Sequence, residues 1–428
     1  MREIDEFVRA FREDGWASEP FPRMLDIVGA GGALPLGTRL LEDVSDGGTF
    51  FDAALSYLSI DEFDAAVDRA IEHLVVGRAP NPDAADSVIA HASLQASHSL
   101  TPHLPALWER WPNHRSSYEM WPWRGADTAE CERLAAAFDH DPSSADARRA
   151  WAGLLESRSP GGIEAARARA GMVTELWSPG YEGPTAPAEA WFDLVGFELL
   201  DDGVRRRCAD AVFHLSFDPA YLGRADDPVH VRPGTHPTWF DLGDPVATAA
   251  FGGSVEEACA VCGGVLHRLL ELGDPEVLEP LGITARSRVE LATCLSCLGW
   301  TEDVLWFRHD ADGRPSPLHE GGRQEPEFPV GALPVGEVGL VPTPARWRMQ
   351  DRALANGREN LHRVGGEPTW VQSADHPDCP SCARSMDFVL QLDSLPDGPG
   401  EWLWGSGGLA YVFWCDRCAV SAGRWQCT

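Results

Sequence analysis

Eight of the eleven cysteines form four Cys-x-x-Cys pairs, all in the C-terminal half of the chain. The pairs are Cys259/Cys262, Cys294/Cys297, Cys379/Cys382 and Cys415/Cys418. A tight turn between two such cysteines brings both sulfurs to one metal ion, and two turns from separate strands complete a tetrahedron. The spacing therefore predicts two structural zinc ions per chain, each held by four cysteines with no position left open for a substrate.

The two halves of this region look like copies of one module. The first and second pairs are separated by 31 residues in one copy and by 32 in the other. In each copy an apolar segment begins four residues after the first pair, and a candidate strand leads into the second pair. Each copy also contains Pro-Thr-Trp and a hydrophobic-Gly-Gly. The matching apolar segments and strands are Leu266–Leu272 with Met386–Leu392, and Val289–Thr293 with Leu409–Trp414.

Three other interpretations of the cysteines compete with two zinc ions. Trp414-Cys415-Asp416-Arg417-Cys418 resembles the redox motif of thioredoxin-like proteins, which relies on a helix N-terminus to lower the thiol pKa. One copy can also have lost its metal while the other keeps it. A zinc deaminase is excluded, because it requires His-x-Glu and Pro-Cys-x-x-Cys and the chain contains neither.

The charge is strongly one-sided, with a formal net charge of −31. All 35 basic residues are arginine, which is typical of a GC-rich genome. A negative field of this size repels phosphate backbones and attracts basic proteins. General nucleic-acid binding is therefore not expected, whereas a basic protein partner is. The chain has no run of 18 apolar residues and begins with several acids, so we expect a cytoplasmic protein that does not bind membranes.

The fold class expected is α+β and multidomain: an N-terminal α-helical domain followed by two related, mainly β zinc-binding modules. Residues 1–175 are the predicted helical domain, and short polar breaks between its helices suit stacked helical hairpins. The helices expected there are a capped one starting at Ser59-Ile60-Asp61-Glu62, then 83–100, 126–138 and 144–155.

The predicted β modules occupy residues 176–345 and 346–428, where proline and glycine become frequent. A linker rich in proline, glycine and glutamate is expected over 310–344. Alternation along 386–393 places Met386, Phe388, Leu390 and Leu392 on one face of a strand.

A peptide groove is predicted around Pro368-Thr369-Trp370. Glycines allow close approach of another backbone, so Gly365 and Gly366 would admit a client strand by edge pairing, with Pro368 and Trp370 beside it. No phosphate-binding loop and no Gly-x-Ser-x-Gly occurs in the chain. No catalytic residues are predicted, and the chain is expected not to be an enzyme.

Several motifs of the C-terminal region carry a resemblance to a known family: His362 to Gln372, Cys379-Pro380-Ser381-Cys382, Phe388 to Leu392, Trp404-Gly405 and Tyr411-Val412-Phe413. On these residues the region resembles the bacterial YwqG family. The resemblance covers about 355–428 well and 230–310 weakly, and does not extend to the N-terminal half. The C-terminal region is also, more distantly, similar to the programmed cell death protein 2 family, which shares Gly-Gly-x-Pro-x-Trp followed by Cys-x-x-Cys. Many YwqG-like proteins lack the cysteines, so the zinc prediction depends on the spacing.

Together these features predict a zinc-binding, non-enzymatic protein-interaction module, acting as an adaptor or client chaperone for a basic protein. The resemblance implies the chaperone role, since the eukaryotic relatives are regarded as chaperones for a ribosomal protein. It also leaves two alternatives. One is an immunity protein that neutralises a toxin, and the other is an enzyme that processes RNA or protein.

Overall fold

The computed structural model covers 428 residues and divides into two compact units. One unit comprises Met1–Arg205 with Pro344–Met349, and the other comprises Arg206–Thr343 with Gln350–Thr428. The structure describes residues 2–14, 20–44, 48–76, 82–110, 121–173, 188–219, 221–222, 236–319, 323–326, 328–331, 333–348, 350, 354–395 and 402–427.

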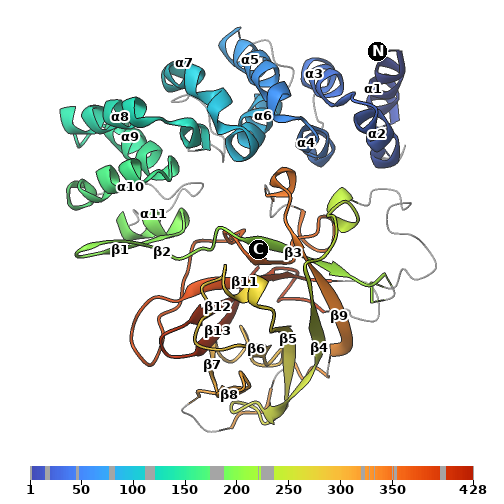
Figure 1. The fold of residues 1–428 in the computed structure, drawn as a ribbon, viewed down its shortest axis with the longest axis vertical. Helices are drawn as coiled ribbons and strands as arrows, with labels where there is room; N and C mark the ends of the chain where they lie inside the picture. The colour runs from blue at the N-terminus through green and yellow to red at the C-terminus, as the bar shows by residue number, and fades with distance from the viewer. Residues whose placement is uncertain are drawn as a thin grey trace. The chain divides into compact units, whose positions relative to one another are not determined.

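The first unit is a succession of short α-helices (Figure 1). They are α1 (Arg2–Asp14), α2 (Pro20–Gly29), α3 (Ala33–Asp43), α4 (Gly48–Ser56), α5 (Ile60–Val76), α6 (Pro82–Gln95), α7 (Leu104–Arg110), α8 (Thr128–His140), α9 (Ala145–Glu156), α10 (Pro160–Arg167) and α11 (Ala188–Leu194). A two-stranded sheet, β1 (Phe197–Leu200) with β2 (Gly203–Arg206), follows them. No helix in the described part of the chain is long and apolar enough to cross a membrane.

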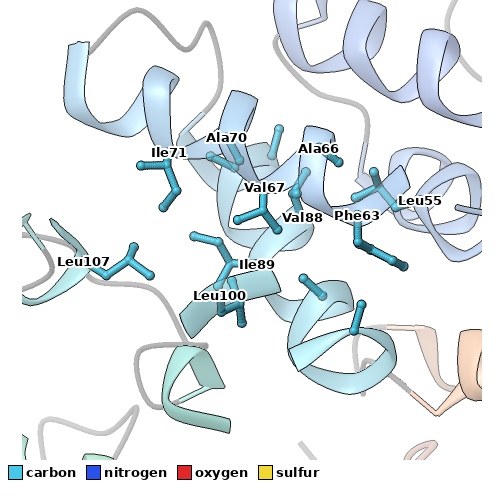
Figure 2. Packing of buried hydrophobic residues seen from close by; sticks show 14 of the residues in the cluster. Leu55, Phe63, Ala66, Val67, Ala70, Ile71, Val88, Ile89, Leu100 and Leu107 are labelled. Atoms are coloured by element: carbon cyan, nitrogen blue, oxygen red, sulfur yellow. The ribbon is translucent and has the colours of Figure 1, made fainter. Parts of the chain in front are cut away.

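The predicted helices start within two residues of the expected positions, but the one expected over 83–100 ends at Gln95 and a 3₁₀ segment, Ser97–His103, follows it. The carboxylate of Glu62 accepts hydrogen bonds from the backbone N–H and the hydroxyl of Ser59, so residues at the two ends of the first turn hold the start of α5. Apolar residues at helical spacing on α5 and α6 then face each other, as Figure 2 shows for Val67 and Val88. These buried side chains are continuous with one core that runs through the whole helical unit.

The second unit is mainly β, as expected. Its strands are β3 (Val212–Phe217), β4 (Ala247–Ala258), β5 (Val265–Leu272), β6 (Val289–Thr293), β7 (Leu305–His309), β8 (Pro315–Pro317), β9 (Leu333–Pro342), β10 (Arg363–Gly365), β11 (Asp387–Asp393), β12 (Leu409–Cys415) and β13 (Val420–Gln426). A short helix, α12 (Pro275–Leu278), lies between β5 and β6. The linker predicted over 310–344 is wrong, because β8 and the ten-residue β9 lie within it.

The described strands of this unit form one antiparallel sheet in the order β6-β5-β4-β9-β3-β10-β11-β12-β13-β7-β8. The order interleaves the two predicted modules, since β10 pairs with β3 and β13 pairs with β7. The division into compact units therefore differs from the predicted boundaries at 175 and 345. It lies at Arg205/Arg206, and residues 206–343 and 350–428 share one body because strand pairing joins them.

The sheet is curled, so that its two ends approach each other. The backbone N–H of Glu290 on β6 donates to the carbonyl of Gly313, in the turn between β7 and β8, at 3.0 Å. One apolar core gathers side chains from both predicted modules, including Leu291 and Val412. A smaller cluster surrounds the second set of cysteines.

A β-bulge overturns the predicted facing of the 386–392 segment. The register of β11 against β12 shifts between Phe388 and Leu390. Met386 and Phe388 consequently pack in the smaller cluster, whereas Leu390 and Leu392 pack in the main core. Strict alternation fails here because the extra residue of a bulge moves every following side chain to the other face.

Candidate metal centres

The first four cysteines meet in one cluster. Cys259 follows the end of β4 and Cys262 precedes β5, while Cys294 follows the end of β6 directly. The turn at Cys259 is closed by two backbone hydrogen bonds, from the N–H of Cys259 to the carbonyl of Gly264 and from the N–H of Gly263 to the carbonyl of Cys259. We call each such Cys-x-x-Cys turn a knuckle. The N–H of Gly264 also donates to Sγ of Cys262 at 3.3 Å.

The second four cysteines meet in the same way. The knuckle at Cys379 has the equivalent pair of backbone hydrogen bonds, with Arg384 and Ala383 in the places of Gly264 and Gly263. The second knuckle begins at Cys415, the last residue of β12, and β13 follows it at Val420.

The two sites share the register of the strands between their knuckles. In the first site His267 on β5 pairs with Thr293, and in the second Asp387 on β11 pairs with Trp414. Each of these residues is the fifth after the last cysteine of its first knuckle, and each partner directly precedes the second knuckle. Both ladders then contain a bulge at the same offset, between Arg268 and Leu270 or between Phe388 and Leu390. Shared register and shared bulge support the duplication that the spacing indicates.

The geometry of both clusters suits a tetrahedral thiolate site. Within each cluster all four Sγ atoms lie within 4.8 Å of one another. Sγ–Sγ distances are 3.9 Å for Cys259–Cys297, 3.7 Å for Cys262–Cys294 and 3.7 Å for Cys382–Cys415. Bonds of about 2.3 Å in a tetrahedron separate the sulfurs by about 3.8 Å. These two groups can each hold a metal ion, and tetrahedral sulfur ligands favour zinc or iron.

The thiols of the first site illustrate why such a cluster needs a cation. A hydrogen bond from Cys294 lowers the pKa of Cys259 to about 5, and the same contact raises the pKa of Cys294. Burial raises the pKa of Cys297 to about 12. Hydrogen bonding and burial therefore favour protons on some of these sulfurs, and a metal ion among them would favour four thiolates.

The thioredoxin-like interpretation of Cys415 and Cys418 does not agree with the local structure. The pair joins β12 to β13, so no helix begins there to stabilise a thiolate. Burial raises the pKa of the Cys415 thiol, which is the opposite of what a redox nucleophile needs. All eleven cysteines are described, and none forms a disulfide bond.

A carboxylate inside the second site joins it to the other half of the unit. Asp416 lies between Cys415 and Cys418 and accepts hydrogen bonds from the backbone N–H groups of Thr284 (2.9 Å) and Ala285 (2.8 Å). It also accepts one from Nε1 of Trp414 at 3.0 Å. Sequence reasoning missed this role, because nothing near Asp416 in the chain points to a partner 132 residues away.

The predicted partner-binding residues lie within the second unit. Gly365 is buried on β10, which has β3 on one side and β11 on the other. Edge pairing of a client strand at Gly365 is therefore wrong, since both edges of β10 are occupied. Gly365 and Gly366 do permit a close approach, but of this chain's own segment at Ala211 and Val212.

Pro368 and Trp370 are half-buried. The ring of Trp370 lies 4.8 Å from that of Tyr411 and 6.2 Å from that of Phe413, so much of it contributes to the smaller core cluster. Their role in partner binding stays a prediction.

No protein-family model matches the chain, and no solved structure matches it. The chain is 38% identical over 66 residues to "Uncharacterized protein YpfL" of Salmonella typhimurium (strain LT2). That segment is 15% of this chain and 15% of YpfL, so the chain matches only a small part of this relative's length.

Proposed function

We propose that this protein is a zinc-stabilised, non-enzymatic interaction protein that binds a basic protein partner. The observation that carries the proposal is the closed character of both cysteine clusters. Each provides four sulfurs, from cysteines of which three are buried in the first cluster and two in the second. Tetrahedral sites of this kind hold zinc without a vacant position for substrate. Zinc is favoured over iron as a purely structural ion because it has no redox chemistry of its own.

The zinc part of the proposal is tested by elemental analysis. The purified protein should contain two zinc ions per chain. Cys382→Ser should reduce this number to one and destabilise the second unit, because a structural zinc site contributes on the order of 10 kcal/mol to folding.

Cys427→Ser is the matched control, since Cys427 lies outside both clusters and its loss should leave two zinc ions. Helical circular dichroism from residues 1–205 should persist in Cys382→Ser. A metal content near zero, or iron in place of zinc, would contradict the proposal.

An exposed aromatic pair supports the interaction part of the proposal. Trp300 and Phe328 are each 46% exposed, and their ring centroids lie 4.6 Å apart. Trp300 follows the second knuckle of the first site and also contacts Trp425, at 5.8 Å between centroids. Trp425 is itself held by a hydrogen bond from Nε1 to the carbonyl of Leu298. Rigidly supported, exposed aromatic rings are typical of the residues that contribute most to protein–protein binding.

A further inference from the structure

An exposed aromatic patch lies beside the second knuckle of the first site. It consists of Trp300 in the turn after that knuckle, Phe328 in the connection between β8 and β9, and Trp425 on β13. The ring of Trp300 is inclined at 53° to that of Phe328 and at 59° to that of Trp425. Because the rings are tilted and not stacked flat, parts of their faces remain open to solvent, in agreement with the 46% exposure of Trp300 and of Phe328.

Hydrogen bonds fix the backbone on both sides of this patch. The N–H groups of Trp300 and of the next two residues all donate to the carbonyl of Cys297, which closes a tight turn directly after the last cysteine. In the segment that carries the phenylalanine, the N–H of Val330 donates to the hydroxyl of Ser296 at 2.8 Å. A binding surface that is held in place before a partner arrives loses little conformational freedom on association.

The two segments that carry the exposed rings are acidic. Glu302 and Asp303 lie in the turn that carries Trp300, and Glu325 lies in the segment that carries the phenylalanine. Asp303 and Glu325 are exposed. The basic residue of these segments is Arg323, whose guanidinium group lies beside the first knuckle. The local charge therefore has the same sign as the net charge of −31, and both attract a cation.

The helical unit shows how an indole ring of this chain binds a cation. The guanidinium carbon of Arg149 lies 3.6 Å from the centroid of the Trp108 ring, and that of Arg133 lies 4.6 Å from the same ring. The negative face of the aromatic ring attracts the positive charge. Among the described residues no arginine lies over the ring of Trp300 or of Phe328 in this way, so the open parts of these faces are accessible to a cation from another molecule.

From these observations we propose that the aromatic patch binds an arginine side chain of the basic partner, with the guanidinium group against Trp300 and Phe328. Arginine is favoured over lysine because its planar group stacks on an aromatic ring while its N–H groups remain free to bind carboxylates, here those of Asp303 and Glu325. The inference rests on the proposed function, since it names the chemical group by which that partner is recognised.

The test uses the zinc-loaded full chain and two short peptides, acetyl-Gly-Arg-Gly-Arg-Gly amide and the same peptide with citrulline, which has nearly the shape of arginine but no charge. The protein is labelled with ¹⁵N-tryptophan, and the indole NMR signal missing from Trp300→Phe identifies Trp300. The arginine peptide should shift this signal saturably. Fluorescence anisotropy of dye-labelled peptides should show that it binds about fivefold more tightly than the citrulline peptide.

Three variants separate the aromatic contact from the general attraction of an acidic protein for a basic peptide. Trp300→Leu leaves the net charge unchanged and should weaken binding of the arginine peptide about fivefold, and Phe328→Leu tests the second exposed ring in the same way. Val335→Ala is the matched control, because Val335 is exposed and apolar but lies outside the patch. Zinc content is measured on every variant, so that loss of a metal site is distinguished from loss of the patch.

The inference is overturned if the arginine peptide does not shift the Trp300 signal, if the citrulline peptide binds equally well, or if Trp300→Leu and Phe328→Leu both bind like the wild type. Affinity capture distinguishes its failure from failure of the proposed function. A basic partner held equally by the wild type and by Trp300→Leu overturns the inference alone. Arginine-peptide binding at Trp300, with no basic protein captured, overturns the proposed function and leaves the arginine site standing.

Discussion

Gly365 is a residue whose conformation and surroundings both require glycine. Its φ is 72°, and a Cβ atom there would lie 2.2 Å from the carbonyl oxygen of Ala211. The positive φ would strain any other residue at this position. A Cβ atom would also push β10 away from the segment before β3. The close approach expected from the glycine pair thus occurs inside the sheet and stabilises the fold.

Gly365→Ala should therefore lower the free energy of unfolding of the second unit by about 3 kcal/mol, from backbone strain together with the steric clash. Gly282→Ala is the matched control, because Gly282 has a φ of 71° but nothing within 4 Å of its Cβ position. Only the strain applies there, and the loss should be about 1 kcal/mol. Denaturant unfolding of both variants measures the difference, and equal losses would show that the contact with Ala211 is unimportant.

A buried carboxyl gives the second unit a specific pH dependence. Burial raises the pKa of Asp393 to about 7, against the lowering effect of hydrogen bonds donated by the backbone N–H groups of Asn356, Gly357 and Ser394. The ordinary value is about 3.9, so the folded state retains this proton to higher pH than the unfolded state. Its contribution to stability is complete below pH 4 and is lost as pH rises towards 7.

Between pH 5.5 and 6.5 the wild-type protein should lose about 1 kcal/mol of stability that Asp393→Asn does not lose. The neighbouring His362, whose pKa burial lowers to about 3, stays neutral over this range and does not interfere. Urea unfolding at several pH values, with zinc in excess, provides the measurement. Parallel pH profiles for the two proteins would show that Asp393 does not titrate as described.

At the scale of elements, a side chain in one knuckle links it to a loop in the other half of the unit. The knuckle after β12 is held through Asp416 to the loop before β6, and β6 in turn leads into the second knuckle of the first site. Strand pairing of β13 with β7 makes a second connection between the halves. The two cysteine clusters are therefore parts of one structure, although each has its own four cysteines.

Asp416→Ala should cost the second unit about 2 kcal/mol, because it leaves the N–H groups of Thr284 and Ala285 without their charged acceptor. Arg417→Ala changes the adjacent, exposed residue of the same knuckle and should alter stability by less than about 0.5 kcal/mol. Both variants should retain two zinc ions, which separates the effect of the hydrogen bonds from loss of the metal. A full loss of one zinc ion in Asp416→Ala would show instead that the carboxylate is required for the site itself.

For the whole molecule, the net charge of −31 would govern how fast the proposed basic partner associates. A field of this sign accelerates the approach of a basic protein, but it extends only about 8 Å at physiological salt. Contacts made after docking, such as those of an exposed tryptophan, determine instead how long the complex lasts.

Affinity capture with the zinc-loaded chain should therefore recover a basic protein whose association rate falls by about tenfold between low and high salt, with little change in dissociation. Trp300→Ala should raise the dissociation rate, by about thirtyfold if Trp300 is a central contact. The same measurement on Trp370→Ala decides whether the contact predicted from the sequence also contributes. Recovery of nucleic acid alone, or of an acidic protein with salt-independent kinetics, would contradict the proposed function.

Much of the local structure could be predicted from the chain itself. Helix α5 begins where its capping residues lie, β6 and β12 lie where apolar segments lead into the cysteines, and the eight cysteines assemble in two groups of four. These features depend on residues close together in the chain or on a spacing that only a few geometries satisfy. The duplication could be predicted for the same reason, because near-equal spacing reflects equal register.

Only the tertiary structure decided which distant segments pair with each other. No local pattern indicates that β10 lies between β3 and β11. The sequence therefore predicts an open strand edge at Gly365, whereas this residue lies inside the sheet. The role of Asp416 likewise arises where segments from both halves meet. Strand order depends on which apolar faces can be buried together, a property of the folded chain as a whole, whereas ligand spacing and helix capping depend on a few neighbouring residues.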